Sequence, residues 1–230
     1  MGKETMKISD YECMEKYMCS CMLDSAHDKE HIYRVLYVAL DIAQYETDVD
    51  YDVLIAACLL HDIGRQEQLA DSRQCHAAVG ARKAYSFLVD NGHGADFAEK
   101  VASCIRTHRF RESCPPQSIE AKILFDADKI DVTGALGIAR TLLYKGQVGE
   151  ALYSVTEEGE VSDGINDPQP SFFQGYKYKL EGLYSKFYTK RASEIARQRQ
   201  DSAKIFYQSL LDEAKESNIS GRKLLSRMLQ

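Results

Sequence analysis

The apolar positions of this chain recur at the spacing of helices. From residue 32 to residue 43 they follow one another every three or four positions, which places them on one face of a helix. The next segment, from Tyr51 to Asp62, is apolar at most positions, so it predicts a helix that is buried on nearly all sides. Asp28 is a suitable N-cap for the first helix, and Gly64 suits the position just after the second.

Two more helices are predicted before the break at Cys114-Pro115-Pro116. Residues 74–89 keep the helical spacing and end at Asn91-Gly92, a dipeptide that favours turns. Asp96 is placed to cap the next helix, which we expect to end near His108.

The second half of the chain is also helical in pattern. Residues 118–144 form a long apolar segment that predicts one helix or two. The stretch 156–170 is rich in glycine, proline and acidic residues and predicts the longest loop. Helical spacing resumes over residues 174–190 and 193–217, and we find no convincing strand-like alternation. The sequence therefore predicts an all-α fold.

Composition bounds the size and class of the protein. The 230 residues suit one large domain, which we place at residues 1–190, followed by a C-terminal helical extension at residues 191–230. Hydrophobic residues make up 44% of the chain, enough for a packed core, and only four prolines interrupt the helices.

The charge and the cysteine content indicate which classes of partner and which cellular compartment to expect. The net charge is −6, which disfavours a stable nucleic-acid partner but leaves a small anionic substrate open. Seven cysteines without a CxxC pair indicate a reducing compartment. No stretch approaches the about 20 apolar residues that a membrane span needs, and the first 25 residues lack the apolar run of a signal peptide. We expect a cytoplasmic protein that does not contact a membrane.

The candidate chemistry lies in three places within the first 131 residues. His31 lies on the first strongly patterned helix, His61-Asp62 closes the buried helix, and the segment Asp126–Asp131 holds three aspartates. Imidazole and carboxylate are ligands for divalent first-row metals. Burial of an unpaired carboxylate costs several kcal/mol, and a bound cation is one of the few partners that offsets the cost.

Each feature has an ordinary alternative when it is taken alone. A capping aspartate beside a surface histidine explains most His-Asp pairs, and the three later aspartates could form a solvated face. The combination in this order is what favours a metal site.

The order His31, His61-Asp62, Asp128 resembles the H…HD…D signature of the HD-domain superfamily. Four longer segments resemble the bacterial YpgQ/YedJ-type subfamily: His27 to Val35, Ala56 to Arg65, Asp126 to Asp131, and Gly134 to Arg140. The resemblance covers roughly residues 15–190. It implies an HD-type helical bundle with a metal at its centre and a C-terminal helical extension.

The resemblance also implies the ligands and the activity. His31, His61, Asp62 and Asp128 would hold one divalent ion, with Asp128 chosen by the superfamily's Ala-Asp-Lys/Arg pattern. Mn²⁺ or Mg²⁺ is the expected ion, and Fe, Co, Ni or Zn are alternatives. The subfamily is regarded as nucleotide pyrophosphohydrolases, so a (deoxy)nucleoside triphosphate is the expected substrate and pyrophosphate the expected product.

One departure from the pattern concerns the catalytic residues. Several nucleotide-cleaving HD enzymes carry a glutamate three residues after the HD aspartate, where this chain has Arg65. The identity of the general base is then open between Glu67 and Asp131. Arg65 itself is a candidate for stabilising the charge of the transition state.

Cations and two further histidines are candidates for binding phosphate. His76 and His108 could bind substrate or complete a second metal site, or they could be a surface residue and a helix-end residue. We prefer a single metal, because the carboxylates of Asp62 and Asp128 already balance one divalent charge. The predicted substrate-binding residues are Arg34, Arg65, His76, His108 and Lys129, with Arg109 and Arg140 as further candidates.

Two other functions remain open. A binuclear site would permit phosphodiester cleavage or di-iron oxygenase chemistry, and an inactive site would leave a non-catalytic nucleotide-binding module. The expected partner in each case is a small phosphorylated molecule such as a nucleotide. A homodimer is a further candidate arrangement.

Overall fold

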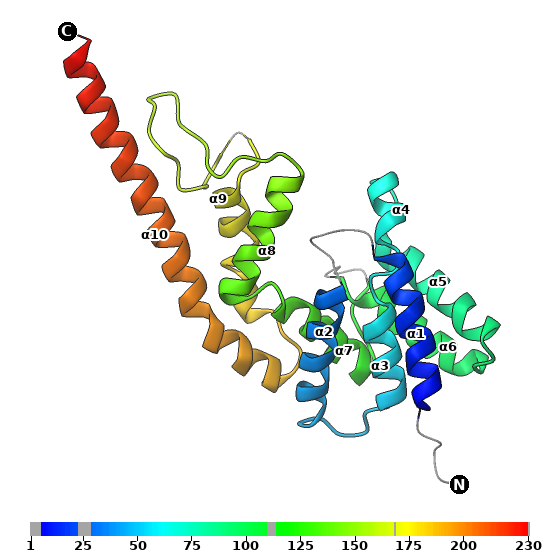
Figure 1. The fold of residues 1–230 in the computed structure, drawn as a ribbon. Coiled ribbons are helices and arrows are strands. Elements are labelled where there is room, and N and C mark those ends of the chain that lie inside the picture. Colours follow the sequence, from blue (N-terminus) through cyan, green and yellow to red (C-terminus); the bar gives the residue numbers. More distant parts are fainter. Residues whose placement is uncertain (1–5, 23–28, 110–113, 168, 230) are drawn as a thin grey trace. The chain divides into compact units, whose positions relative to one another are not determined.

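The computed structural model describes residues 6–22, 29–109, 114–167 and 169–229 of the chain (Figure 1). Helices account for its regular structure, and β pairing in the described residues is limited to two isolated bridges, Ala151 with Ser171 and Val155 with Val161. The predicted all-α fold is confirmed. The elements are α1 Ile8–Cys21, α2 Lys29–Ala43, α3 Tyr51–Leu60, α4 Arg65–Ala70, α5 His76–Asp90, α6 Ala95–Thr107, α7 Ile119–Ile130, α8 Gly134–Gln147, α9 Phe172–Gly175, the π-helix η1 Tyr176–Leu180, the 3-10 helix η2 Leu183–Ser185 and α10 Lys190–Met228.

The chain divides into two compact units. The first consists of residues 1–131 together with Tyr188–Ala192, and the second consists of Val132–Phe187 together with Ser193–Gln230. All the predicted metal ligands belong to the first unit. The boundary that we predict at residue 190 separates a functional domain from a C-terminal extension. The two compact units do not test that boundary, so it stays a prediction.

Helix α3 lies at the centre of the first unit, as its apolar sequence predicts. It packs against α1, α2, α6 and α7, and the side chains from Val53 to Leu60 are buried except that of Ile55. Asp50 caps its N-terminus by accepting a hydrogen bond from the backbone N–H of Val53 at 3.4 Å. The helix ends at Leu60, so His61 and Asp62 lie in the turn that follows a fully packed helix.

One predicted helix cap differs from the structure, and another lies where the structure does not describe the chain. Gly94, rather than Asp96, occupies the N-cap of α6, and Asp96 pairs one turn later with Lys100, whose Nζ lies 2.6 Å from Oδ2. Asp28, the cap expected for α2, lies outside the described residues.

Gly64 is required for a reason that differs from the expected one. Its φ of −96° is open to any residue, so it is no left-handed helix terminus. A Cβ at this position would instead lie 2.4 Å from the carbonyl oxygen of His76 and 2.6 Å from the amide nitrogen of Gly80. The missing side chain therefore lets α5 pack directly against the turn that carries His61 and Asp62.

The long apolar segment 118–144 is two helices. Ser118 caps α7 through the backbone N–H of Ala121 at 3.1 Å, and a short break after Asp131 precedes α8. Gly134 begins α8 with a φ of +66°, a left-handed conformation that glycine adopts without strain.

Asp126 joins α7 to the segment that precedes α10. It is fully buried, and its carboxylate accepts hydrogen bonds from the backbone N–H groups of Tyr188 and Thr189 and from the Thr189 hydroxyl, at 2.7 to 3.0 Å. Burial raises the pKa of Asp126, and these donors oppose the shift. The cost of burying this carboxylate is thus offset by residues far along the chain.

Two regions differ from the sequence prediction in their helices. The helix expected over residues 174–190 is wrong: the segment is broken into α9, η1 and η2, because Phe172, Phe173 and Tyr176 are buried in a core that also includes Tyr207 of α10. Helix α10 is longer than the expected 193–217 and runs through 39 residues. Helix α1 was not predicted, because only Met14 and Met18 of its side chains are buried.

Within the described residues, no helix combines the length and apolar character needed to cross a bilayer.

Candidate metal centre

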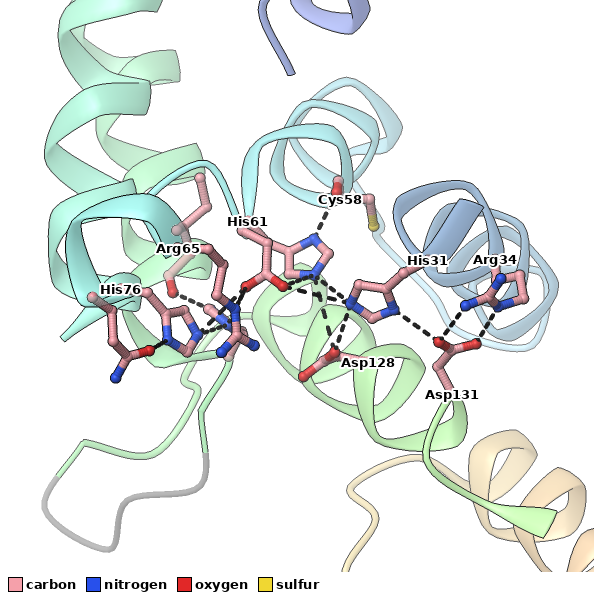
Figure 2. A network of polar contacts seen from close by, with 12 residues as sticks. His31, Arg34, Cys58, His61, Arg65, His76, Asp128 and Asp131 are labelled. Atoms are coloured by element: carbon pink, nitrogen blue, oxygen red, sulfur yellow. Dashed lines mark hydrogen bonds and ion pairs between the residues drawn. The ribbon is translucent and has the colours of Figure 1, made fainter. Parts of the chain in front are cut away.

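Two of the predicted ligands meet at the centre of the first unit. His31, on the first turns of α2, and His61, just after α3, are both buried, and their Nε2 atoms lie 3.4 Å apart (Figure 2). Asp128 of α7 points at the same place, with Oδ1 3.5 Å from Nε2 of His31 and 4.0 Å from Nε2 of His61. Together they form a group that could hold a metal ion.

A second group lies on the other side of Asp62. His76 begins α5 and His108 ends α6, both are buried, and their Nε2 atoms are 3.2 Å apart. Oδ1 of Asp62 lies 3.4 Å from Nε2 of His76 and 3.7 Å from that of His108. These three residues also form a group that could hold a metal ion.

Asp62 is shared between the two groups. While its Oδ1 faces His76 and His108, its Oδ2 lies 3.6 Å from Nε2 of His31 and 3.8 Å from Nε2 of His61. The side chain is fully buried, and neither oxygen makes a hydrogen bond. A buried carboxylate without hydrogen bonds is costly unless cations lie close to it.

The tautomers of the histidines show why a cation fits. Nδ1 of His61 lies 2.8 Å from the carbonyl oxygen of Cys58, and Nδ1 of His108 lies 2.6 Å from that of Ile105. A carbonyl only accepts, so each Nδ1 carries the proton and each Nε2 presents a lone pair to the centre. Nδ1 of His31 donates in the same way to Asp131 at 2.8 Å.

Burial keeps the imidazoles of His61 and His76 neutral. It lowers the pKa of His61 to about 4 and that of His76 to about 2. Facing lone pairs on neutral rings repel each other unless a proton or a metal ion lies between them. The donor set of neutral imidazoles and aspartates is the one that divalent first-row metals prefer, so the residues present fit a metal ion.

The orienting partners follow from where each histidine lies on its helix. His61 and His108 follow helix C-termini, where backbone carbonyls have no partner within the helix, so each histidine donates to the carbonyl three residues before it. His31 and His76 lie at helix N-termini, where such carbonyls are lacking. Their Nδ1 atoms contact side chains from other elements, namely Asp131 and Gln68.

Comparisons with known proteins decide the family. A family model for the HD domain matches residues 29–133, which include both groups. The chain is 30% identical to the uncharacterized protein YpgQ of Bacillus subtilis (strain 168) over 190 residues, or 81% of this chain and 83% of YpgQ.

The chain belongs to the HD-domain superfamily.

Solved structures share the fold of this HD-domain protein. A Lactobacillus plantarum protein matches with a TM-score of 0.72 at 24% identity and covers 91% of this chain and 98% of its own, which shows the fold alone. Bacillus subtilis YpgQ in complex with ADP matches with a TM-score of 0.68 at 27% identity and coverages of 88% and 97%. A predicted HD superfamily hydrolase from an uncultured Thermotogales bacterium matches at 0.58 and 28%, with coverages of 90% and 92%.

Asp131 and Arg34 of the HD domain, predicted as a candidate base and a substrate-binding residue, contact each other. Arg34 donates to both oxygens of Asp131, at 2.7 and 3.1 Å, while Asp131 also accepts from His31 (Figure 2). Asp131 is buried and engaged, so it is badly placed to act as a general base. We infer that this pair orients His31 rather than contacting substrate.

Glu67 and Lys129 are also engaged outside the two groups. Glu67 Oε1 lies 2.8 Å from Nζ of Lys83, which donates as well to the backbone carbonyl of Ile63 at 2.7 Å. Lys129 lies over the ring of Phe125, with Nζ 4.4 Å from its centroid. These contacts join Glu67 to α5 and place the Lys129 ammonium over an aromatic ring of its own helix.

Arg65 is the cation that the HD domain brings to the centre. Its Nε lies 3.0 Å from Oδ1 of Asp62, and 24% of its side chain is exposed. Burial works against ionisation of Asp62, yet Arg65 and His61 hold the pKa of Asp62 well below its usual range. Arg109 lies nearby with Nη1 3.9 Å from Sγ of Cys75, whereas Arg140 belongs to the second unit.

Sequence reasoning missed Gln68 and Lys83. Gln68 contacts Nδ1 of His76 at 2.6 Å, and Lys83 holds the turn after α3 through Ile63. Neither residue belongs to a motif that suggests a role. The signal that could have pointed to Gln68 is the position of His76 at a helix N-terminus, which requires an acceptor from elsewhere.

Proposed function

We propose that this chain is a metal-dependent phosphohydrolase that cleaves a nucleoside triphosphate and releases pyrophosphate. Membership of the HD-domain superfamily and the similarity to proteins described as HD-superfamily hydrolases support hydrolysis. The structure of YpgQ with ADP supports a nucleotide as the ligand class.

One observation carries the proposal. Asp62 is fully buried without a hydrogen bond on either oxygen, between two pairs of imidazoles whose lone pairs converge. A divalent ion is the group that satisfies this arrangement. We assign His31, His61, Asp62 and Asp128 as its ligands, with Mn²⁺ or Mg²⁺ as the expected ion.

Each residue near the centre has a task in this reaction. A bound divalent ion would act as a Lewis acid toward phosphate oxygens and lower the pKa of bound water. Asp128, 23% exposed, lies where the centre opens to solvent. Arg65, also partly exposed, supplies a guanidinium that can donate to phosphate oxygens as negative charge shifts toward the leaving pyrophosphate.

We propose that the proton of the attacking water does not go to Glu67 or Asp131, because these carboxylates are paired with Lys83 and Arg34. The Nε2 atoms of His76 and His108 lie 3.2 Å apart and can accept hydrogen bonds from a water molecule. We propose that this pair orients the attacking water when one ion is bound, and that the proton of the water passes to solvent. The new bond then forms between the water oxygen and the α-phosphorus, the bond from the α-phosphorus to the α,β-bridging oxygen breaks, and that oxygen leaves with pyrophosphate.

A second candidate function rests on the second ligand group. If Asp62, His76 and His108 hold an ion of their own, Asp62 bridges two metals, and phosphodiester cleavage or di-iron oxygenase chemistry becomes available on the same scaffold. Two irons per chain in purified protein would favour this view.

The test is a screen of purified protein, supplemented with Mn²⁺ or Mg²⁺, against nucleoside triphosphates and phosphodiesters. The expected products are a nucleoside monophosphate and pyrophosphate in equal amounts. Release of inorganic phosphate alone would contradict the cleavage position. Nucleotide binding without turnover under every metal condition would identify a non-catalytic binding module instead.

A further inference from the structure

Arg65 lies where a second metal ion would have to bind. It is the first residue of α4, three positions after Asp62, and its Nε approaches Oδ1 of that aspartate at 3.0 Å. The same oxygen is the one that faces His76 and His108. Figure 2 shows the Arg65 side chain beside the His76 ring.

We propose that the Arg65 guanidinium takes the place of a second metal ion and keeps the centre mononuclear. This inference rests on the proposed metal centre and adds the residue that sets its stoichiometry.

The charges of the two groups support this assignment. Asp62 is the only carboxylate of the second group, and Arg65 already pairs with the oxygen that it offers there. A divalent ion between His76 and His108 would meet a fixed positive charge in a buried place, where screening by water is weak. The guanidinium and the ion therefore compete for one oxygen.

The first group offers an ion more negative charge. It has Asp128 in addition to the other oxygen of Asp62, and the nearby Arg34 donates to both oxygens of Asp131. A single ion is thus expected to bind between His31 and His61.

The backbone that carries Arg65 is fixed in place. Lys83 donates to the carbonyl of Ile63 at 2.7 Å and to Glu67 at 2.8 Å, so it ties the turn before Arg65 and the helix after it to α5. Nε of Arg65 is buried and makes no hydrogen bond, which leaves its charge directed at Asp62. The position is consistent with a permanent counter-charge rather than a surface arginine.

The test measures metal stoichiometry, which does not depend on turnover. Wild type, Arg65→Gln, Arg65→Met and Arg65→Lys are equilibrated with Mn²⁺, and bound metal per chain is measured by elemental analysis. Arg73→Gln is the matched control, because Arg73 pairs with Asp71 at 2.9 Å but is 89% exposed. Circular dichroism checks that each variant keeps its helices.

We expect one ion per chain in wild type, Arg65→Lys and Arg73→Gln, and two in Arg65→Gln and Arg65→Met. The double variant Arg65→Gln/His76→Ala should return to one. In the variants with two ions, EPR should show the spin coupling of neighbouring Mn²⁺ ions, which an isolated ion lacks.

The outcomes separate this inference from the proposed function. Two ions in wild type, or one ion in folded Arg65→Gln and Arg65→Met, would overturn the role of Arg65 and leave the hydrolase proposal standing. If neither neutral variant folds, titration of wild type with excess Mn²⁺ decides, because a second bound ion contradicts the proposal and saturation at one supports it. No bound ion in wild type would contradict the metal centre itself.

Discussion

The two ligand groups of this HD domain are similar in their ligands and different in their surroundings. Each contains a pair of imidazoles with Nε2 atoms 3.4 or 3.2 Å apart, and both share Asp62. In the first group, the helix-N-terminal histidine contacts the carboxylate of Asp131. In the second, it contacts the neutral amide of Gln68, and Arg65 neutralises the shared aspartate.

This difference shows that ligand type alone does not decide where a cation binds. A carboxylate behind an imidazole strengthens it as a metal ligand, and a guanidinium next to a ligand oxygen weakens the site for a cation. The predictions below alter one group or the residue they share, from the largest expected effect to the smallest.

Removal of the shared residue should have the largest effect. We expect Asp62→Ala to lose stoichiometric metal and to lose turnover by more than the roughly 10–100-fold that removal of an outer partner costs. Metal analysis and product assay measure both. Asp71→Ala is the matched control, since Asp71 follows α4 and pairs with exposed Arg73. An Asp62→Ala protein that keeps one ion and full turnover would refute the central role of this residue.

Removal of Asp131, the carboxylate that contacts His31 of the first group, should have the second-largest effect. We expect Asp131→Ala to weaken binding of the single ion by about 10–100-fold, because His31 loses the acceptor that fixes its tautomer. Asp131→Asn, whose amide oxygen can still accept from Nδ1, should retain more of the affinity. Calorimetric titration with Mn²⁺ gives both values. Equal losses in the two variants would point to packing rather than to orientation of His31.

Removal of Gln68, which contacts His76 of the second group, should leave the bound metal in place. We expect Gln68→Ala to retain one ion per chain and to lower kcat by roughly 10-fold, because His76 would be oriented less well to accept a hydrogen bond from the attacking water. A fall in metal content would show instead that the second group holds the ion.

Glu67→Gln should have the smallest effect. Burial raises the pKa of Glu67, but its pairing with Lys83 holds that pKa below the usual value, so the carboxylate is engaged with a cation of α5. Turnover within roughly threefold of wild type at all pH values is expected, since loss of a general base would cost about 100-fold or more. A loss of that size would restore Glu67 as the base.

The sequence carried enough information to find the candidate ligands but not the residues that contact them. His31, His61, Asp62 and Asp128 lie in local patterns, at a helix start, after a buried helix and within an apolar helix. The contact between Arg34 and Asp131 joins positions 97 residues apart, so neither residue shows its partner locally. Each was therefore assigned to the role that its charge suggests on its own.

The same distinction holds for the fold. Helix α3 could be predicted because its burial is evident from composition along ten residues. The broken segment after Ser171 could not, because its conformation is determined by packing against Tyr207 of α10. Gly64 was recognised as a special position, but its reason, the close approach of α5, depends on tertiary structure.

The buried carboxylate of Asp126 has a consequence for the order in which this protein can be made. Its donors at Tyr188 and Thr189 follow 62 and 63 residues later in the chain. The ribosome has therefore synthesised every candidate metal ligand before it synthesises those donors. Until then, completion of α7 beside α3 leaves an unpaired carboxylate in the interior. We expect the matched HD segment, residues 29–133, to be a poor expression fragment, and fragments that extend through residue 192 to be the shortest that fold around Asp126.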